Sequence, residues 1–437
     1  MTTPSATNLY IHFPFCRRKC TYCALHSRAG TSTAAREEYV RRLIGSIRVE
    51  LGSDRVELGS GRVELESSSH PTLPDPIRPY STLSDPTRPY PTLKTIYFGG
   101  GSPALCDLEP LFAALAPLRA PDCEFTVELH PLDVTADLLK TLRSGGVNRI
   151  SMGVQSLNDD ILRHMGRGYT FMEAERAFYL IREYFDNAGI DLIVGYPGET
   201  QALTPRHARL AKWGLTHCSV YSLILEENSI LAHLLQNSPT PNGDSPPIPQ
   251  RGQSPYPPGT VPPPLGDCPP LPDDDTVLNR ISIVSRFLQE IGLKRYEISN
   301  YARPGFECRH NMAVWSGEDY IGLGEGAHGR IGLSRTEGTR DCPHEGGGTV
   351  PPGGGDCPRG GVQFLTPEQD LVERKIFALR TRNGLDLADT RWGQSPSGWR
   401  EILDRFAAEG LLARSGTVYR LTERGTEICD SILAELV

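Results

Sequence analysis

Near its amino terminus the sequence reads LYIHFPFCRRKCTYC at residues 9–23, an apolar run that leads directly into three cysteines. Residues 9–13 are rich in aromatic and branched side chains, which is typical of a buried strand. Cys16, Cys20 and Cys23 follow with the spacing Cx3Cx2C, so their sulfurs lie within one tight loop and can reach a common centre. This strand and its loop are the best starting point for interpreting the rest of the chain.

Two kinds of inorganic centre fit three neighbouring cysteines. A structural zinc site usually has four ligands, often as two separated CxxC halves, and no second half is visible in this sequence. An iron–sulfur cluster is held by thiolates, and three of them leave one iron open to an outside ligand. Arg17, Arg18 and Lys19 lie between the cysteines, and the spacing predicts that these cations favour the thiolate forms.

The composition indicates a cytoplasmic protein. Among 437 residues there are 45 Lys+Arg and 53 Asp+Glu, which gives a net charge of −8 without a basic stripe, so a dedicated nucleic-acid binder is not expected. No run approaches the roughly 20 apolar residues that cross a bilayer, and the first residues do not resemble a secretory signal. Cytosolic thiols seldom form structural disulfides, so the 11 cysteines point to other roles.

After the first strand, strand-like and helix-like stretches alternate. Parallel strands need crossover helices, so this alternation predicts a parallel α/β sheet with its ligands at the carboxyl ends of the strands. No GxGxxG follows the first strand, which favours an open or partial barrel over a doubly wound nucleotide-binding sheet. The strand-like runs are residues 9–13, 95–98, 125–129, 149–154, 190–194 and 218–225, and the amphipathic stretches are residues 35–47, 108–118, 136–143, 172–184 and 205–213.

Three inserts interrupt this pattern. Short repeats of the type RVELGSD begin at Arg48 and, with repeats of the type TLPDPIRPYS, fill the insert at residues 52–91. Residues 236–275 are rich in proline, and residues 336–361 are rich in glycine. Such sequences bury too little apolar surface to offset the entropy of ordering the chain, so we expect disorder in all three. A proline segment that docks a partner is the alternative interpretation of the second insert.

The remaining residues define three further regions. Residues 1–235 form the main part of the barrel and residues 276–335 complete it, with a helix at 277–291, a strand at 295–298 and then a loop rich in glycine and aromatic residues. Residues 362–437 form a smaller α+β domain with helices at 369–379 and 399–408 and a β wing, which resembles a winged helix.

The motifs together resemble a known family. The Cx3Cx2C loop matches that of radical S-adenosylmethionine (SAM) enzymes. Four further motifs narrow the resemblance to the oxygen-independent coproporphyrinogen oxidase group, in particular its heme-chaperone branch, HemW. They are IYFGGGSP, GVNRISMGVQSLNDDILRHMGR, DLIVGYPGET and YEISNYARPGFECRHN. The resemblance implies a partial (β/α)6 TIM-like barrel. It also implies a [4Fe–4S] cluster on Cys16, Cys20 and Cys23, with SAM bound to the open iron.

The family positions also imply a set of SAM contacts. A glycine run after a strand lets the backbone approach a ligand closely, although a plain tight turn is the alternative. Carboxylates suit ribose hydroxyls and an ammonium group, and an arginine suits a carboxylate. The residues carried over from the family are Tyr10, Tyr22, Ala24, Gly100, Gly101, Ser102, Glu128, Gln155, Arg167 and Asp191.

Two features separate the branches of the group. The genuine oxidase has a fourth cysteine two residues after the third, where this sequence has Leu25, and it has an N-terminal extension that is missing here. Both favour a heme chaperone, and the alternative is an oxygen-independent coproporphyrinogen III oxidase. The chaperone branch binds heme through HNxxYW, which corresponds to His310, Asn311 and Trp315, with Val314 in place of tyrosine.

His310 is therefore the candidate heme ligand, and a satisfied histidine in a glycine-rich turn is the alternative. Cys308, two residues upstream, is a candidate soft ligand. The resemblance implies heme or a porphyrin and heme-accepting respiratory proteins as partners, and it leaves room for peripheral membrane contact and a homodimer. Whether SAM is cleaved in turnover, and hence whether the protein is an enzyme, stays open.

Overall fold

The computed structural model describes residues 6–51, 92–199, 204–227, 229–236, 269–337, 362–391 and 393–437. The insert at residues 52–91 lies wholly outside these ranges, and the inserts at 236–275 and 336–361 lie mostly outside them, so their disorder stays a prediction. At their margins, the first repeat begins at Arg48 inside helix α1 (Thr33–Leu51), helix α8 (Asp274–Glu290) begins inside the second insert, and strand β13 (Ser334–Glu337) extends into the third.

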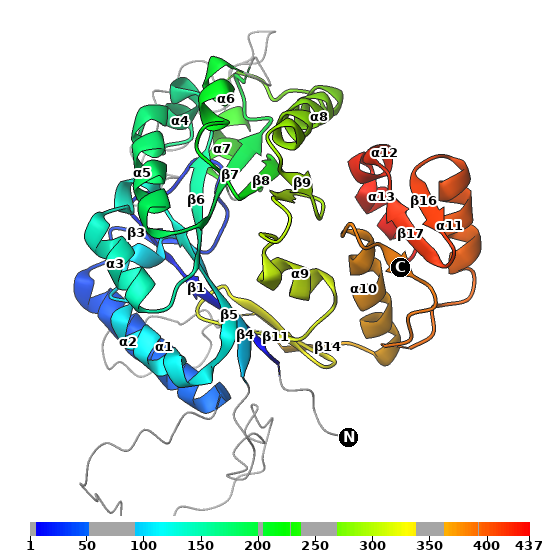
Figure 1. Cartoon of the computed structure of the whole chain (residues 1–437), viewed down its shortest axis with the longest axis horizontal. Helices are drawn as coiled ribbons and strands as arrows, with labels where there is room; N and C mark the ends of the chain where they lie inside the picture. Colours follow the sequence, from blue (N-terminus) through cyan, green and yellow to red (C-terminus); the bar gives the residue numbers. More distant parts are fainter. Residues whose placement is uncertain are drawn as a thin grey trace, which may run out of the picture.

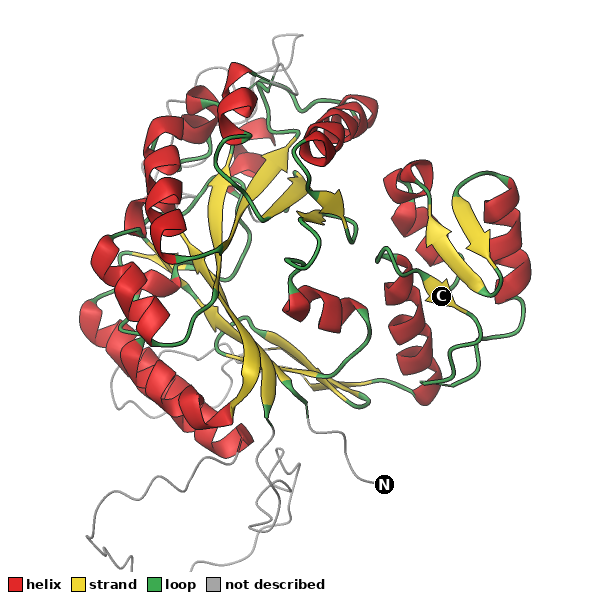
Figure 2. Cartoon of the chain, viewed as in Figure 1, coloured by secondary structure: helices red, strands yellow, loops and turns green. Residues whose placement is uncertain are grey.

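Six parallel strands in sequence order form the centre of the molecule. They are β1 (Asn8–Phe13), β4 (Leu93–Gly100), β5 (Arg119–Leu129), β6 (Arg149–Gln155), β7 (Asn187–Val194) and β8 (His217–Ser222). Among the described residues they belong to a 12-stranded sheet that curves without closing (Figures 1 and 2). The predicted partial (β/α)6 barrel is therefore confirmed.

Shorter strands extend the sheet on both sides. β11 (Tyr320–Leu323) pairs in parallel with β1, and β12 (His328–Ile331), β13 and β14 (Val362–Phe364) continue beyond it as antiparallel strands. On the far side β10 (Asn300–Ala302) and β9 (Lys294–Arg295) follow β8. A separate short pair, β2 (Phe15–Cys16) and β3 (Arg28–Ala29), brackets the cysteine loop.

Helices cover the outer face of the sheet (Figure 2). They are α1 (Thr33–Leu51), α2 (Glu109–Leu115), α3 (Ala136–Ser144), α4 (Asp159–His164), α5 (Phe171–Tyr184), α6 (Pro205–Leu210), α7 (Ile230–Gln236) and α8, with short 3-10 turns at Pro103–Leu105, Ala116–Leu118 and Pro131–Asp133.

Helix α5 illustrates why these helices form where they do. Thr170 accepts from the backbone of Glu173 while Glu173 accepts from the backbone of Thr170, a capping box that stabilises the helix start by about 1 kcal/mol. The same helix buries Phe171 and Phe178, whose rings stack against Trp213 at centroid distances of 5.6 and 5.1 Å. Local capping and core packing therefore specify the same helix.

The glycine-rich stretch after α8 contains more structure than the sequence predicts. The predicted strand at 295–298 is reduced to β9, and the predicted loop contains β10, the short helix α9 (Arg309–Trp315), β11 and β12. With seven residues, α9 is too short to give a clear helical pattern. Its position depends on Glu124, a distant carboxylate on β5 that accepts hydrogen bonds from the amides of Arg309 and His310 at 2.9 and 3.0 Å.

The C-terminal unit begins after the large sheet. It contains α10 (Pro367–Leu379), β15 (Leu385–Asp386), α11 (Trp399–Ala408), β16 (Leu412–Ser415), β17 (Val418–Leu421), α12 (Glu423–Glu427) and α13 (Cys429–Ala434). The β16–β17 hairpin is the predicted wing. The sequence assigns residues 362–364 to this unit, but β14 pairs with β13 and so belongs to the large sheet.

A buried ion pair joins the two units. Arg374 on α10 donates to the Asp319 carboxylate at 2.8 Å and to the carbonyl of Gly332 at 3.0 Å. Beside it, the ring of Phe377 lies edge-on to Trp315 at the end of α9, with centroids 5.5 Å apart. α9 is therefore packed between β4 and α10 (Figure 1). None of the described helices is long and apolar enough to cross a membrane.

Candidate functional site

The three cysteines of the Cx3Cx2C loop differ from the other described cysteines in their exposure. Cys16, Cys20 and Cys23 are all partly exposed and free, whereas the remaining five in the described ranges are buried. The loop is anchored by its backbone, since the Thr21 amide donates to Met165 at 3.1 Å and the Leu231 amide donates to Thr21 at 2.7 Å. The loop thus presents three sulfurs at the carboxyl edge of β1.

This donor set fits a [4Fe–4S] cluster. Each thiolate of such a cluster binds a different iron, so the three sulfurs need not converge on one point. In the part of the chain that the structure describes, no three His, Cys, Asp or Glu side chains are grouped for a single metal ion. Cys16, Cys20 and Cys23 would hold three irons.

Lys19 favours the thiolates of Cys16 and Cys23, as the sequence predicts, but burial opposes it. Burial raises the pKa of Cys16 to about 11 and also raises that of Cys23, and the nearby Lys19 offsets only part of this effect. Arg17 is bound to the Asp133 carboxylate, and Lys19 donates to the carbonyl of Leu25 at 2.8 Å. Burial thus opposes the thiolate form of these two cysteines more strongly than Lys19 favours it.

Arg167 connects the cysteine loop to the end of β6. Its Nη1 donates to the Cys20 sulfur at 3.4 Å, its Nη2 to the Gly153 carbonyl at 2.7 Å, and its Nε to the Tyr169 hydroxyl at 2.9 Å. The sequence assigns this arginine to the SAM carboxylate. In the structure it donates hydrogen bonds to Gly153, Tyr169 and Cys20, and the one to Cys20 brings it into direct contact with the cysteine loop.

The glycine run at the end of β4 packs against the first strand. A Cβ at Gly101 would collide with the carbonyl oxygens of Phe13 and Phe15, and Gly100 has a φ of +101°, which favours glycine. The protein's own packing therefore requires glycine at both positions, whether or not a ligand approaches. Ser102 is buried, and its hydroxyl donates to Asp133.

Side chains from successive strands face the inside of the partial barrel. Tyr97 donates to the Glu128 carboxylate at 2.8 Å, the Gly100 amide donates to the same carboxylate at 3.1 Å, and Ser151 donates to Asp191 at 3.1 Å. Burial and the nearby Asp191 raise the pKa of Glu128 to about 7, and burial raises that of Asp191. The structure thus brings two predicted SAM contacts together.

Tyr10 and His12 continue this inner surface towards the cysteine loop. The His12 Nε2 donates to the carbonyl of His26 at 2.9 Å, so its Nδ1 accepts from the Tyr10 hydroxyl at 3.1 Å. His26 lies three residues after Cys23, so this chain of bonds links the predicted SAM surface to the exit of the cysteine loop.

The other predicted SAM contacts lie at the same edge. Gln155 ends β6 with a φ of +68°, the one positive φ among the described residues other than glycine, and it lines a cavity of about 80 Å³ with residues of β7. Tyr22 packs beside Ile161 and Met165, and burial raises its pKa. Ala24 is exposed.

Two buried carboxylates at this edge were not among the predicted contacts. Asp133 binds both Arg17 and Ser102, which joins the cysteine loop to the glycine run. Glu325, in the turn after β11, binds Arg28 and accepts from Arg42 at 3.3 Å, and so holds the exit of the cysteine loop. Only their tertiary contacts distinguish them from ordinary surface carboxylates.

His310 lies at the opposite edge of the sheet. Its Nδ1 is 2.8 Å from the hydroxyl of Thr95, near the start of β4, and its ring packs 5.4 Å from that of Tyr97. The side chain is 5% exposed, and burial lowers its pKa to about 3, so the imidazole is neutral. Its Nε2 makes no hydrogen bond within the described residues. It is also not sealed, which here means fully buried without a hydrogen-bond partner.

Cys308 is not placed as a soft ligand. It is fully buried at the start of α9, its thiol is directed at Glu124 at 3.6 Å, and burial raises its pKa to about 12. Val314, at the tyrosine position of the HNxxYW pattern, is partly exposed, and Trp315 packs against α10. Burial keeps Cys308 as a protonated thiol, whereas His310 has a ring nitrogen that makes no hydrogen bond within the described residues.

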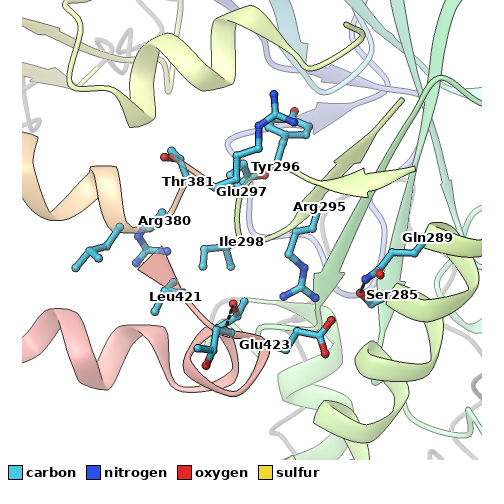
Figure 3. A pocket seen from close by; sticks show the side chains of 14 residues that line it. Ser285, Gln289, Arg295, Tyr296, Glu297, Ile298, Arg380, Thr381, Leu421 and Glu423 are labelled. Carbon is cyan, nitrogen blue, oxygen red and sulfur yellow. Dashed lines mark hydrogen bonds between the residues drawn. The ribbon is translucent and has the colours of Figure 1, made fainter. Parts of the chain in front are cut away.

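A cavity of about 190 Å³ lies elsewhere, between the barrel and the C-terminal unit (Figure 3). Arg295, Glu297, Arg380 and Glu423 are among its lining residues, and it includes none of the predicted site residues. Its charges have partners of their own, since Arg295 donates to Tyr301 at 2.8 Å and Arg380 pairs with Asp430 at 2.6 Å. We therefore place the candidate site at the two edges of the sheet instead.

Comparison with known proteins agrees with this architecture. Residues 88–211 match the family model of the radical SAM superfamily, and residues 365–428 match that of the HemN C-terminal domain. A solved structure, coproporphyrinogen III oxidase (HemN) from Escherichia coli, has a TM-score of 0.67 and 20% identity, covering 99% of this chain and 90% of that one. At that identity the likeness shows the fold alone.

Curated relatives share nearly the whole length. The heme chaperone HemW of Mycobacterium tuberculosis (strain CDC 1551 / Oshkosh) is 30% identical, covering 98% of this chain and 94% of the relative. The heme chaperones HemW of Bacillus subtilis and Escherichia coli are each 28% identical, covering 98% of this chain and 99% and 97% of theirs.

Proposed function

The chain belongs to the HemW family of heme chaperones within the radical SAM superfamily, and from this premise we propose that it binds heme and delivers it to other proteins. A [4Fe–4S] cluster on Cys16, Cys20 and Cys23 and a molecule of SAM are its resident cofactors. The observation that carries the proposal is a neutral histidine, His310, whose Nε2 is not engaged within the described residues. A neutral imidazole nitrogen is a common axial ligand of heme iron.

The chain's own residues define what happens at the carboxyl edge. The three cysteines hold the cluster, and Arg167 donates a hydrogen bond to the Cys20 sulfur, which stabilises its thiolate charge. A bound cluster would supply one-electron chemistry to SAM. Glu128 and Asp191 face the barrel interior, where their carboxyl groups suit ribose hydroxyls, and Tyr10 and Ser102 line the approach.

Further site assignments and the domain boundaries belong to the same proposal. Tyr22, Ala24, Gly100, Gly101 and Gln155 complete the SAM contacts. The described residues up to 337, together with β14, form the unit that carries the cluster, and the residues from 365 onward form the second unit. The protein works in the cytoplasm on heme-accepting respiratory proteins, through peripheral membrane contact and as a homodimer.

An anaerobic heme titration tests the proposal. The full-length protein, with its cluster reconstituted from iron and sulfide, is titrated with heme and followed by the Soret band, and His310→Ala is compared with the wild type. We expect a saturable complex in the wild type and a large loss of affinity in the variant. Equal binding by both proteins would remove His310 from the site, and no binding by either would remove heme.

The runner-up function is the oxidase reaction. Leu25, which stands at the place of the oxidase's fourth cysteine, is 54% exposed and cannot ligate iron. Incubation of the cluster-loaded protein with SAM, a reductant and coproporphyrinogen III separates the two functions. We expect no protoporphyrinogen, and its formation at many turnovers per chain would establish the oxidase instead.

A further inference from the structure

Three buried side chains form a hydrogen-bonded line at the amino edge of the sheet. Asn8 begins β1, Thr95 lies opposite it on β4 in the parallel register, and His310 lies on α9. The Thr95 hydroxyl is 2.9 Å from Asn8 Oδ1 and 2.8 Å from His310 Nδ1. The three residues are 1%, 2% and 5% exposed, so bulk solvent does not compete for the bonded atoms.

The surroundings of Asn8 fix the direction of these bonds. Its Nδ2 lies 3.2 Å from the Glu318 carboxylate and 3.1 Å from the carbonyl of Asp319. Both of those groups can only accept, so the amide nitrogen faces them and Oδ1 faces Thr95. Oδ1 in turn can only accept, and therefore the single proton of the Thr95 hydroxyl is directed at Asn8.

This leaves one arrangement for the histidine. A hydroxyl has one proton, and Thr95 has donated it to Asn8, so its oxygen can only accept from His310. The proton of the neutral imidazole must then be on Nδ1. The opposite tautomer would set the Nδ1 lone pair against the Thr95 oxygen or leave the buried Oδ1 of Asn8 without a donor, and buried polar groups seldom remain unpaired.

We infer that Thr95, oriented by Asn8, is a positioning residue that holds His310 in the Nδ1–H tautomer and so keeps the Nε2 lone pair available for iron. The claim that this lone pair binds heme iron rests on the proposed heme-binding function. Second-shell partners of metal-binding histidines typically fix the tautomer in this way. Here the partner is a hydroxyl made directional by an asparagine.

Another buried histidine shows the contrast within the same fold. His217 on β8 has its Nε2 2.8 Å from the hydroxyl of Tyr296, and its Nδ1 is sealed without a partner. Burial lowers the pKa of both histidines, and Arg149 contributes to each shift. Of these two histidines, His310 is the one whose Nδ1 is engaged and whose Nε2 is not sealed.

The tautomer can be measured before any heme is added. Ring ¹⁵N–¹H correlation spectra of the heme-free, full-length protein labelled with ¹⁵N-histidine report which nitrogen carries the proton, and His310→Ala assigns the signal. We expect Nδ1–H in the wild type and in Thr95→Ser. In Asn8→Ala the freed Thr95 hydroxyl can donate to Nδ1, so we expect the proton to move to Nε2.

Heme affinity is the second readout. Thr95→Val and Asn8→Ala should weaken heme binding by about 10–100-fold, whereas Thr95→Ser should stay within about threefold of the wild type. Thr216→Val is the matched control, because it also removes a buried threonine hydroxyl, here one that lies 3.1 Å from Asn187 Oδ1 and 3.0 Å from the Ala188 carbonyl and makes no hydrogen bond to His310. In this variant the tautomer of His310 and the heme affinity should be those of the wild type.

The outcomes separate the two claims. An Nε2–H signal in the wild type, or an unchanged Nδ1–H signal in both Thr95→Val and Asn8→Ala, would overturn the positioning role whatever heme does. If one of these variants does not fold, the other still decides. A tautomer that responds as expected, together with equal heme affinity in the wild type and His310→Ala, would preserve the positioning role and refute the heme ligand.

Discussion

The two edges of the parallel sheet hold their key side chains in opposite ways. At the carboxyl edge, three half-exposed cysteines lie on a loop held mainly by backbone bonds and by Arg167. At the amino edge, His310 is buried and bonded to side chains from β1 and β4. Asn8 and Phe13 are five residues apart, so the edges are separated by about 16 Å along β1. A layer of tyrosines, Tyr10 and Tyr97, lies between them.

The difference suggests a division of labour. An exposed loop can accept a large inorganic group with little rearrangement. A buried imidazole is instead preorganised, and a ligand can bind it only through its free nitrogen. The two edges should then respond independently to mutation, because sites this far apart with no shared partners usually behave additively.

Loss of one cluster cysteine should have the largest effect. Alanine at Cys16, Cys20 or Cys23 should reduce the iron and sulfide content of anaerobically prepared protein to near background, since two thiolates seldom retain a cluster. Iron analysis and the visible spectrum measure this. Cys106→Ala, which removes a buried thiol, is the control and should keep its iron. A brown Cys20→Ala protein would contradict the assignment.

The converse test acts at the amino edge. His310→Ala should weaken heme binding by at least about 100-fold, because it removes the ligand itself rather than its support, yet it should leave the iron and sulfide of the cluster unchanged. Soret titration and iron analysis on the same sample give both values. Loss of the cluster in this variant would show that the edges are coupled.

The carboxylates that face the barrel interior at the carboxyl edge should give the stability a pH dependence. Glu128 has a pKa of about 7 in the folded protein against 4.5 as its ordinary value, so its contribution to stability is fully present below pH 4.5 and is lost as pH rises through 7. Between pH 5 and 7.5 this costs about 2 kcal/mol of unfolding free energy. Denaturant unfolding of the wild type and Glu128→Gln measures it, and the stability difference between them should shift by that amount in favour of the variant. A pH-independent difference would contradict the raised pKa.

A smaller effect is expected where the cysteine loop meets the glycine run. Asp133→Asn removes the charge that binds Arg17 and Ser102 and should lower the unfolding free energy by about 1.5 kcal/mol. It should also speed the loss of cluster iron to a chelator. Asp137→Asn breaks only an exposed pair with Lys140, so both quantities should stay near the wild type.

The smallest effect is expected at the contact between α9 and the C-terminal unit. Phe377→Leu keeps an apolar side chain but loses the edge-on contact with Trp315, which should cost about 1 kcal/mol of unfolding free energy. Heme affinity should change by less than about twofold, because His310 is held separately by Thr95 and by Glu124. A larger change would mean that α10 helps to position the histidine.

The sequence predicts one edge far better than the other. The cysteine spacing, the six strands and α11 follow from local patterns, since each depends on neighbouring residues. Helix α9 is set by Glu124, nearly two hundred residues earlier, and the roles of Asn8, Thr95 and Asp133 depend on which strands become neighbours. Single polar residues at strand ends carry no local signal for such contacts.

The order of the sheet has a consequence for biosynthesis. β1 is completed first, yet it lies between β4 and β11, and the residues of β11 begin at Tyr320. At about 5–20 residues per second, one side of β1 stays unpaired for about 15–60 s while the ribosome makes the intervening chain. During that interval the cysteines next to it are already outside the ribosome, and the nascent edge is open to wrong partners. The cysteine loop is therefore made long before the strand that completes its side of the sheet.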